Sequence, residues 1–208
     1  YNTLPPAIAD RVLRGEQVND AFDSAAVIFM DMVGFTTMSS SMDPNDVVRL
    51  LSGIFTACDA IMNEHGLMKI KTIGDSYMAV AFPSEHVQGE AEQRRDIAQR
   101  AARAALQLLH EVSPEGVRFR IGIHIGPVTA GVIGTERLQY DVWGDTVNVA
   151  SRMESNSQPG RIHVSSGFAL ALNGEKAKWR NGEMALTLRG EVEIKGKGTM
   201  TTYWLEGT

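Results

Sequence analysis

Two carboxylates stand at the ends of short apolar segments of the chain. Asp31 directly follows the apolar run at residues 25–30, and Asp75 lies in the Gly-Asp turn of a predicted hairpin at residues 68–80. If the run and the hairpin are neighbours in one sheet, the two carboxylates repel unless a cation or a basic side chain lies between them. Hard divalent cations such as Mg²⁺ take oxygen ligands and share them with phosphates. The pair therefore suits a metal site, although Asp is also an ordinary turn former beside Gly.

The loop after Asp31 is suited to holding phosphate oxygens. Gly34 allows close approach of the backbone, and the amides of Phe35 and Thr36 precede the next helix. The sequence has no G-x-x-x-x-G-K-[ST] motif, so this would not be a P-loop. An ordinary Ser/Thr-rich turn is the alternative interpretation.

A predicted helix at residues 145–155 carries an amide and a cation on one face. Asn148 and Arg152 are four residues apart, which places them side by side on a helix. Together they could orient a sugar and stabilise charge that develops on a phosphate, whereas the plainer alternative is a solvated Arg beside an Asn. Lys195 and Lys197 alternate with glycines further on, which is compatible with a phosphate-facing loop or with an exposed hairpin end.

The elements that must position these side chains follow the order β-α-β-β-α-β, the ferredoxin-like arrangement of an α+β domain. The strands are predicted at residues 25–30, within 68–80 and at 117–125, and the second helix at 91–112. The first helix is expected to begin at Asp43-Pro44, an N-cap followed by a first-turn proline, and to end at Gly66. A strand at residues 140–143 and C-terminal strands around Val192 and Tyr203 complete the chain.

Composition narrows the class of protein. The 208 residues are enough for one domain with a sizeable core, and the net charge of -5 argues weakly against nucleic-acid binding. Cys58 is the only cysteine, which excludes an intramolecular disulfide and favours a reducing compartment. The sequence shows neither a signal peptide nor an apolar run long enough to span a bilayer. Because the chain begins with Tyr1, we expect it to be an excerpt of a longer protein.

Taken together, several stretches resemble the class III nucleotide cyclase catalytic domain. They occur in the family's order and cover nearly all of the chain from Ala25 onward. The matching stretches are IFMDMVGFT at residues 28–36, KIKTIGDSYMAV at 69–80, IGIHIGPVTAGVIG at 121–134, YDVWGDTVNVASRMES at 140–155 and IKGKG at 194–198.

The resemblance implies a cyclase domain at residues 25–208, with residues 1–24 leading in from an upstream regulatory or membrane region. It implies a homodimer with catalytic sites at the subunit interface, in which one subunit supplies the metal carboxylates and the other the base reader. Each site would hold two Mg²⁺ or Mn²⁺ ions. The domain would lie in the cytoplasm, and membrane attachment of the full-length protein is compatible with the resemblance. The residues implied are Asp31, Asp75 and the Met32 carbonyl for the metals, Asn148 and Arg152 for ribose and transition state, Lys195 for the terminal phosphates, Lys71 and Asp141 for the purine, and Gly34, Phe35 and Thr36 for further substrate contacts.

The predicted purine readers select a base on chemical grounds. Lys71 only donates hydrogen bonds and ionised Asp141 only accepts them, whereas adenine offers an acceptor at N1 and a donor at its exocyclic amine. Guanylyl cyclases of the family typically carry Glu and Cys at these positions. We therefore expect an adenylyl cyclase that converts ATP to 3′,5′-cyclic AMP and pyrophosphate. A guanylyl cyclase and a non-catalytic nucleotide-binding dimerisation module are the alternatives.

One position departs from part of the family. Pro127 stands where one half of the mammalian heterodimeric cyclases carries an Arg thought to face phosphate. The proline fits the homodimeric members, in which one chain carries both the metal pair and the Asn-Arg pair.

Overall fold

The fold is a single mixed sheet with helices on both faces. The computed structural model describes residues 4–112, 116–135, 137–174, 179–180 and 184–207, so the ends of the two predicted regions, residues 1–3 and 208, lie outside the described residues. The helices are α1 (Pro6–Leu13), α2 (Phe35–Ser39), α3 (Pro44–Glu64), α4 (Glu90–Glu111), α5 (Asp145–Ser155) and α6 (Ser166–Asn173). The strands are β1 (Asn19–Val33), β2 (Met68–Ile73), β3 (Ser76–Ala81), β4 (Arg118–Ile133), β5 (Gln139–Trp143), β6 (Ile162–Ser165), β7 (Trp179–Arg180), β8 (Met184–Ile194) and β9 (Gly198–Gly207).

The predicted ferredoxin-like core is confirmed. The sheet order is β2-β3-β1-β4-β6-β9-β8-β7, with β5 pairing to β4 off this path. The first four of these strands pair in antiparallel fashion, with α3 between β1 and β2 and α4 between β3 and β4. The first strand and the hairpin are therefore neighbours, because β1 pairs directly with β3.

Several elements differ from the sequence-based expectation, among them β6 and α6, which were not predicted, and three further elements lie near the site. β1 begins at Asn19 rather than Ala25, because a bulge between Phe22 and Ala25 lets its first residues keep pairing with β4. β4 continues to Ile133, since its second half pairs with both β1 and β5. The stretch after Val33 forms the short helix α2, where a loop was expected, because Gly34 takes a left-handed conformation that turns the chain.

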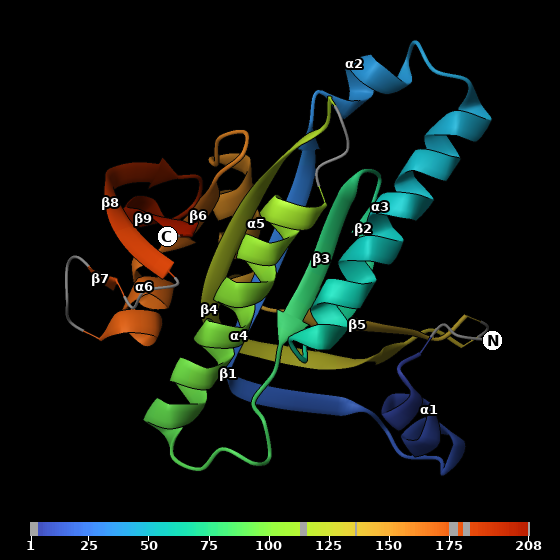
Figure 1. Cartoon of the computed structure of the whole chain (residues 1–208). Coiled ribbons are helices and arrows are strands. Elements are labelled where there is room, and N and C mark those ends of the chain that lie inside the picture. The colour runs from blue at the N-terminus through green and yellow to red at the C-terminus, as the bar shows by residue number, and fades with distance from the viewer. Residues whose placement is uncertain (1–3, 113–115, 136, 175–178, 181–183, 208) are drawn as a thin grey trace.

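The helices divide the core into two faces. α3, α4 and α6 pack on one face, and α3 and α4 lie in front of the sheet in Figure 1. The opposite face buries residues of α1, β5 and α5 against the same central strands. Alternate residues of β1 explain this, since Ile28 and Met30 point to the first face and Val27 and Phe29 to the second.

The predicted start of α3 is confirmed. The Asp43 side chain accepts a hydrogen bond from the Asn45 amide at 2.8 Å, and Pro44 occupies the first turn. No helix within the described residues is long and apolar enough to cross a membrane.

α5 lies unusually close to the sheet. A Cβ atom built on Gly122 of β4 would overlap backbone atoms of Met153 and Glu154 in α5. The absence of a side chain at Gly122 therefore fixes how near α5 comes to β4, and with it the position of every side chain that α5 carries.

We expect Gly122→Ala to destabilise the fold, because the added methyl group would force α5 away from β4. Overpacking of this kind typically costs about 1–3 kcal/mol, which urea unfolding monitored by circular dichroism would detect. Gly53→Ala is the matched control, since Gly53 lies within α3 with nothing within 4 Å of a Cβ atom. That control should stabilise the protein by roughly 0.5–1 kcal/mol through helix propensity. Equal unfolding midpoints for the two variants would contradict the packing argument.

Candidate active site

The predicted metal carboxylates meet at one end of the central strands. Asp31 lies near the end of β1, where its Oδ1 accepts a hydrogen bond from Ser76 Oγ at 2.7 Å and its Oδ2 one from Arg120 Nη2 at 2.8 Å. Asp75 lies in the turn between β2 and β3, next to Ser76. Burial raises the pKa of Asp75, and the charge of Asp31 adds to this rise. The two carboxylates are thus close enough to repel each other.

The donor set suits a hard divalent cation. Each oxygen of Asp31 accepts one hydrogen bond in the structure and retains a lone pair for a metal, and a cation would relieve its repulsion with Asp75. No group of three or more His, Cys, Asp or Glu side chains that could hold a metal occurs within the described residues. A metal here would therefore take its other ligands from backbone carbonyls, water or phosphate oxygens. The Met32 side chain is buried, so only the backbone of this residue is available for that purpose.

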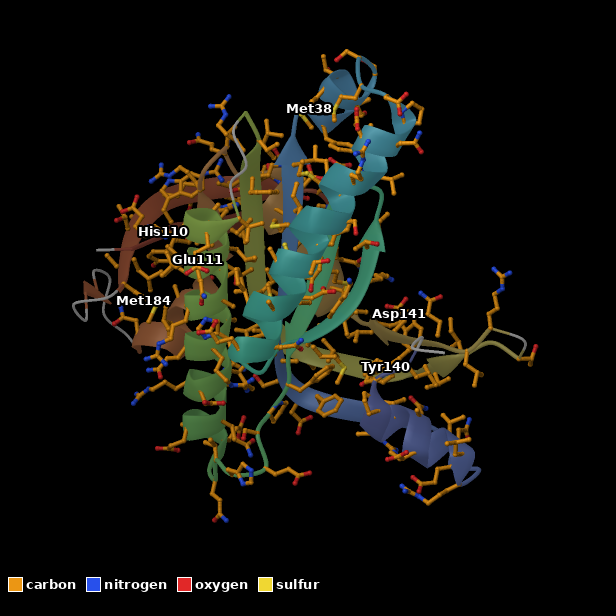
Figure 2. All side chains as sticks on the ribbon, turned by 45° about the vertical axis from the view of Figure 1, so that its right-hand side comes forward. Met38, His110, Glu111, Tyr140, Asp141 and Met184 are labelled. Carbon is orange, nitrogen blue, oxygen red and sulfur yellow. The ribbon has the colours of Figure 1, made fainter. Side chains whose placement is uncertain are left out.

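The predicted phosphate loop lies just beyond these carboxylates. Gly34 has a φ of 77° and precedes α2, whose first helical hydrogen bond runs from the Met38 amide to the Gly34 carbonyl at 3.0 Å. The amides of Phe35 and Thr36 come before that bond and are not used by the helix. Figure 2 shows Met38 on α2 beyond the tip of β1.

The predicted purine readers are in direct contact with each other. Lys71 Nζ of β2 donates to Asp141 Oδ2 of β5 at 2.6 Å, and the Val142 amide donates to the other oxygen of Asp141 at 2.8 Å. Asp141 is only 7% exposed, so its carboxylate is held in a fixed orientation. Figure 2 shows Asp141 on β5 beside Tyr140.

The remaining predicted residues line one cavity. Asn148 and Arg152 of α5 and Lys195 of the β8–β9 turn border a cavity of about 310 Å³. Lys197 in the same turn forms an ion pair with Asp145 at the start of α5, with the nitrogen and oxygen 2.6 Å apart. This ion pair fastens the lysine-bearing turn to the helix that carries Asn148 and Arg152.

A larger cavity of about 920 Å³ lies between the segment at residues 4–6, α3 and the start of β2. It contains none of the predicted site residues, and its charged side chains Asp59, Lys69, Asp96 and Arg100 are already paired with protein groups. We therefore favour the smaller cavity as the candidate active site, because Arg152, Lys195 and the amide of Asn148 can bind a phosphorylated ligand.

The predicted site residues thus form two groups in one chain. The metal group lies at the end of β1 and in the β2–β3 turn, and the nucleotide group lies on β2, β5, α5 and the β8–β9 turn. Among the described residues, no hydrogen bond or ion pair joins a member of one group directly to a member of the other. The two groups are called partial sites, because the resemblance implies that each active site takes one group from each of two subunits.

Sequence reasoning missed the side chains that support these groups. Arg120 contacts Asp31 and also forms an ion pair with Glu154 of α5. The signal for Arg120 was present, since it is a charged residue within an alternating strand whose neighbours are buried. Glu154 lies in the family-like stretch, but only the structure shows that it is buried.

The C-terminal end of α5 is held by a second missed group. His163 of β6 is fully buried, with Nδ1 2.8 Å from the Met153 carbonyl oxygen and Nε2 3.1 Å from Arg189 Nη1. Since a carbonyl only accepts and a guanidinium only donates, Nδ1 carries the proton and Nε2 accepts. Arg189 also donates to the Asn156 carbonyl at 2.6 Å and lies over the Trp204 ring. A cation at this end of α5 suits the helix dipole.

Comparison with known proteins gives one consistent result. The family model for the adenylate and guanylate cyclase catalytic domain matches residues 18–207. Human atrial natriuretic peptide receptor 2 is 45% identical over all of this chain and 20% of its own length. An adenylate cyclase of Mycobacterium tuberculosis is 41% identical over 99% of this chain and 45% of its own length. The chain therefore spans a fifth to under a half of these curated relatives.

Solved structures agree with the sequence relatives. The guanylate cyclase domain of RhGC from Catenaria anguillulae, in complex with GTP, has a TM-score of 0.77 and 33% identity, and covers 90% of this chain and 98% of its own. The catalytic core of a rhodopsin-guanylyl cyclase with converted specificity, in complex with ATPαS, has a TM-score of 0.75 and 34% identity over 91% and 98% of the two chains.

The buried His163 predicts a pH dependence of folding stability. Burial lowers the pKa of His163 to about 4, below the ordinary value of about 6.5. Between these values the unfolded chain binds a proton that the folded chain does not, so stability falls as the pH falls from about 6.5 to about 4. The loss from this group approaches about 1.4 kcal/mol per pH unit inside that window.

His163→Gln tests this assignment, because a Gln amide can donate to Met153 and accept from Arg189 without titrating. We expect a shallower fall in urea-unfolding free energy between pH 6.5 and 4.5 for this variant. His86→Gln is the control, since His86 is exposed, and it should keep the wild-type slope. Parallel slopes for His163→Gln and the wild-type protein would show that His163 does not contribute.

Proposed function

Because this chain belongs to the adenylate and guanylate cyclase catalytic domain family, we propose that it converts ATP to 3′,5′-cyclic AMP and pyrophosphate. The proposed sites are shared between two copies of the chain. We choose ATP over GTP because Lys71 and Asp141 are in contact with each other.

The contact between Lys71 and Asp141 is complementary to the Watson–Crick edge of adenine. Lys71 Nζ carries three N–H donors, and one of them donates to Asp141. The others can therefore donate to N1 of the base. The bonded oxygen of Asp141 retains a lone pair for the exocyclic amine. Guanine would place its N1–H against the ammonium group and its carbonyl against the carboxylate, which leaves both charges without a matching partner.

Overall similarity does not decide between the two purines. The structural relatives include a guanylate cyclase domain bound to GTP and a guanylyl cyclase core of converted specificity bound to ATPαS, and their identities to this chain are 33% and 34%. A guanylyl cyclase is therefore the second candidate. We favour the adenylyl assignment because it rests on the two side chains that would touch the base.

The other side chains have roles that follow from their charge and position. The ribose 3′-oxygen would attack the α-phosphorus in line, and the bond to pyrophosphate would break. Asn148 would hold the ribose, Arg152 would offset charge on the α-phosphate, and Lys195 would contact the departing pyrophosphate. Asp31 and Asp75 would hold the two Mg²⁺ or Mn²⁺ ions, with the Met32 carbonyl contributing and Gly34, Phe35 and Thr36 facing the phosphates. Such ions, when bound, lower the pKa of the 3′-hydroxyl and neutralise phosphate charge.

A second copy of the chain is the proposed partner because each chain presents two partial sites. Apolar side chains are exposed at the ends of the strands that carry or adjoin the purine readers: Ile73 of β2 is 57% exposed, Ile133 of β4 is 52% and Trp143 of β5 is 39%. A twofold dimer that buried such side chains could complete two equivalent sites. A non-catalytic module is disfavoured, since this chain retains every residue that the resemblance assigns to catalysis.

We also propose that the chain is the cytoplasmic catalytic module of a longer protein, regulated by an upstream or membrane domain. The supporting observation is that the curated relatives extend well beyond the region that matches this chain.

Substrate choice is the direct test of the adenylyl assignment. Purified protein with Mn²⁺ should turn over ATP with a kcat/KM at least ~100-fold above that for GTP, because the wrong base would leave polar groups unpaired. Lys71→Glu combined with Asp141→Cys should reverse the order, whereas Lys71→Glu alone should lose both activities by placing two carboxylates together. A wild-type preference for GTP would overturn the assignment.

Mixing two inactive variants tests the shared site. Asp31→Asn with Asp75→Asn removes the metal half, and Asn148→Ala with Arg152→Ala removes the other half. Random pairing at equal amounts should restore about a quarter of the wild-type activity, because half of the dimers then hold one intact site out of two. Each variant alone should stay inactive, and a mixture that also stays inactive would place the whole site within one chain.

A further inference from the structure

Arg120 lies between the two partial sites of one chain. Its Nη2 is 2.8 Å from Asp31 Oδ2 of β1, and its Nε is 2.5 Å from Glu154 Oε1 of α5. The side chains of Asp31 and Glu154 are 14% and 9% exposed, and that of Arg120 is 33% exposed. A single guanidinium thus bridges a predicted metal ligand and a buried carboxylate of the helix that carries Arg152.

The contact between Arg120 and Glu154 is a short ion pair. Although Arg120 Nε and Glu154 Oε1 are 2.5 Å apart, neither atom has an aligned hydrogen-bond partner. Their attraction is nonetheless strong, because both atoms are shielded from water and a buried carboxylate is costly unless a cation lies beside it. Glu154 cannot move away, since the close approach of α5 at Gly122 fixes its backbone against β4.

The guanidinium also places a positive charge beside the predicted metal ligand Asp31. Asp31, Asp75 and Glu154 bring three carboxylates to this region, and Arg120 contacts two of them. Without Arg120, the carboxylates of Asp31 and Glu154 would both lose the cation that they contact. With Arg120 in place, part of the charge of Asp31 is already neutralised.

We propose that Arg120 sets the metal affinity of the Asp31–Asp75 pair. Its guanidinium acts as a resident counter-ion, held in place by Glu154, that keeps divalent cations from binding tightly before nucleotide phosphates supply further ligands. The same contacts hold the Asp31 carboxylate in one orientation. This inference rests on the proposed function, in which Asp31 and Asp75 are the metal ligands.

The proposal makes opposite predictions for the two partners of the bridge. Arg120→Gln removes the competing positive charge, so Mn²⁺ should bind the nucleotide-free protein at least ~10-fold more tightly. Glu154→Gln removes one negative charge, and Arg120 then has Asp31 as its remaining ion-pair partner in the bridge. Mn²⁺ should therefore bind this variant more weakly than it binds the wild-type protein. General damage to the site would weaken binding in both variants.

Mn²⁺ binding is measured by electron paramagnetic resonance at about 0.15 M salt, where exposed charges more than ~8 Å away are screened. Arg118→Gln is the matched control, because Arg118 is exposed two residues earlier on β4 and its loss should change the affinity less than twofold. Arg120→Lys keeps the charge but not the forked geometry, so it should retain near wild-type Mn²⁺ affinity while losing kcat.

The outcomes separate this inference from the proposed function. Unchanged or weaker Mn²⁺ binding by folded Arg120→Gln would overturn the inference, whatever the activity of the wild-type protein. If Arg120→Gln does not fold, Glu154→Gln provides the test. Mn²⁺ binding to that variant as tight as, or tighter than, binding to the wild-type protein would contradict the role of Arg120 as a counter-ion. If the wild-type protein turns over no nucleotide, but Arg120→Gln binds Mn²⁺ more tightly and Glu154→Gln more weakly, the inference is upheld and the proposed activity is rejected.

Discussion

The pairing of β1 with β3 on one side and β4 on the other is the constraint on which the site depends. This register brings residues far apart in sequence to one end of the sheet, so that Asp31 meets Ser76 at 2.7 Å and Arg120 at 2.8 Å. A slip by one residue would turn Asp31 to the opposite face. The register resists such a slip because β1 is buried on both faces, and any shift would exchange the apolar side chains that the two cores require.

A second constraint places the nucleotide group. The C-terminal end of α5 rests on β4 where Gly122 has no side chain, and the same end is held by His163 and Arg189. The Lys197–Asp145 ion pair fixes the β8–β9 turn to the start of the same helix. Arg152 and Lys195 therefore reach one cavity because α5 is held at both ends, by β4 and His163 at its C-terminal end and by the β8–β9 turn at its start.

The sequence was sufficient for the features that arise locally. The cap at Asp43, the α5 bounds Asp145–Ser155 and the buried hairpin strand follow from residue type and spacing, and the structure confirms them. The extension of β1 to Asn19 was not predictable, because it depends on a bulge and on pairing with a distant part of β4. Similarly, the partners of Arg120 come from β1 and α5, and no local pattern reveals such a meeting. Family resemblance supplied the roles of the site residues, which periodicity alone left open.

The β2–β3 hairpin links the two groups of site residues through very little chain. Lys71 contacts Asp141 in one group, and only three residues separate it from Asp75 in the other. Any rigid tilt of this hairpin therefore displaces a proposed base reader and a proposed metal ligand together. In mechanical terms the hairpin is a short rigid link between the two groups, so that neither group can move without the other. An insertion in this turn would therefore change the spacing of Lys71 and Asp75, and with it both of the proposed roles.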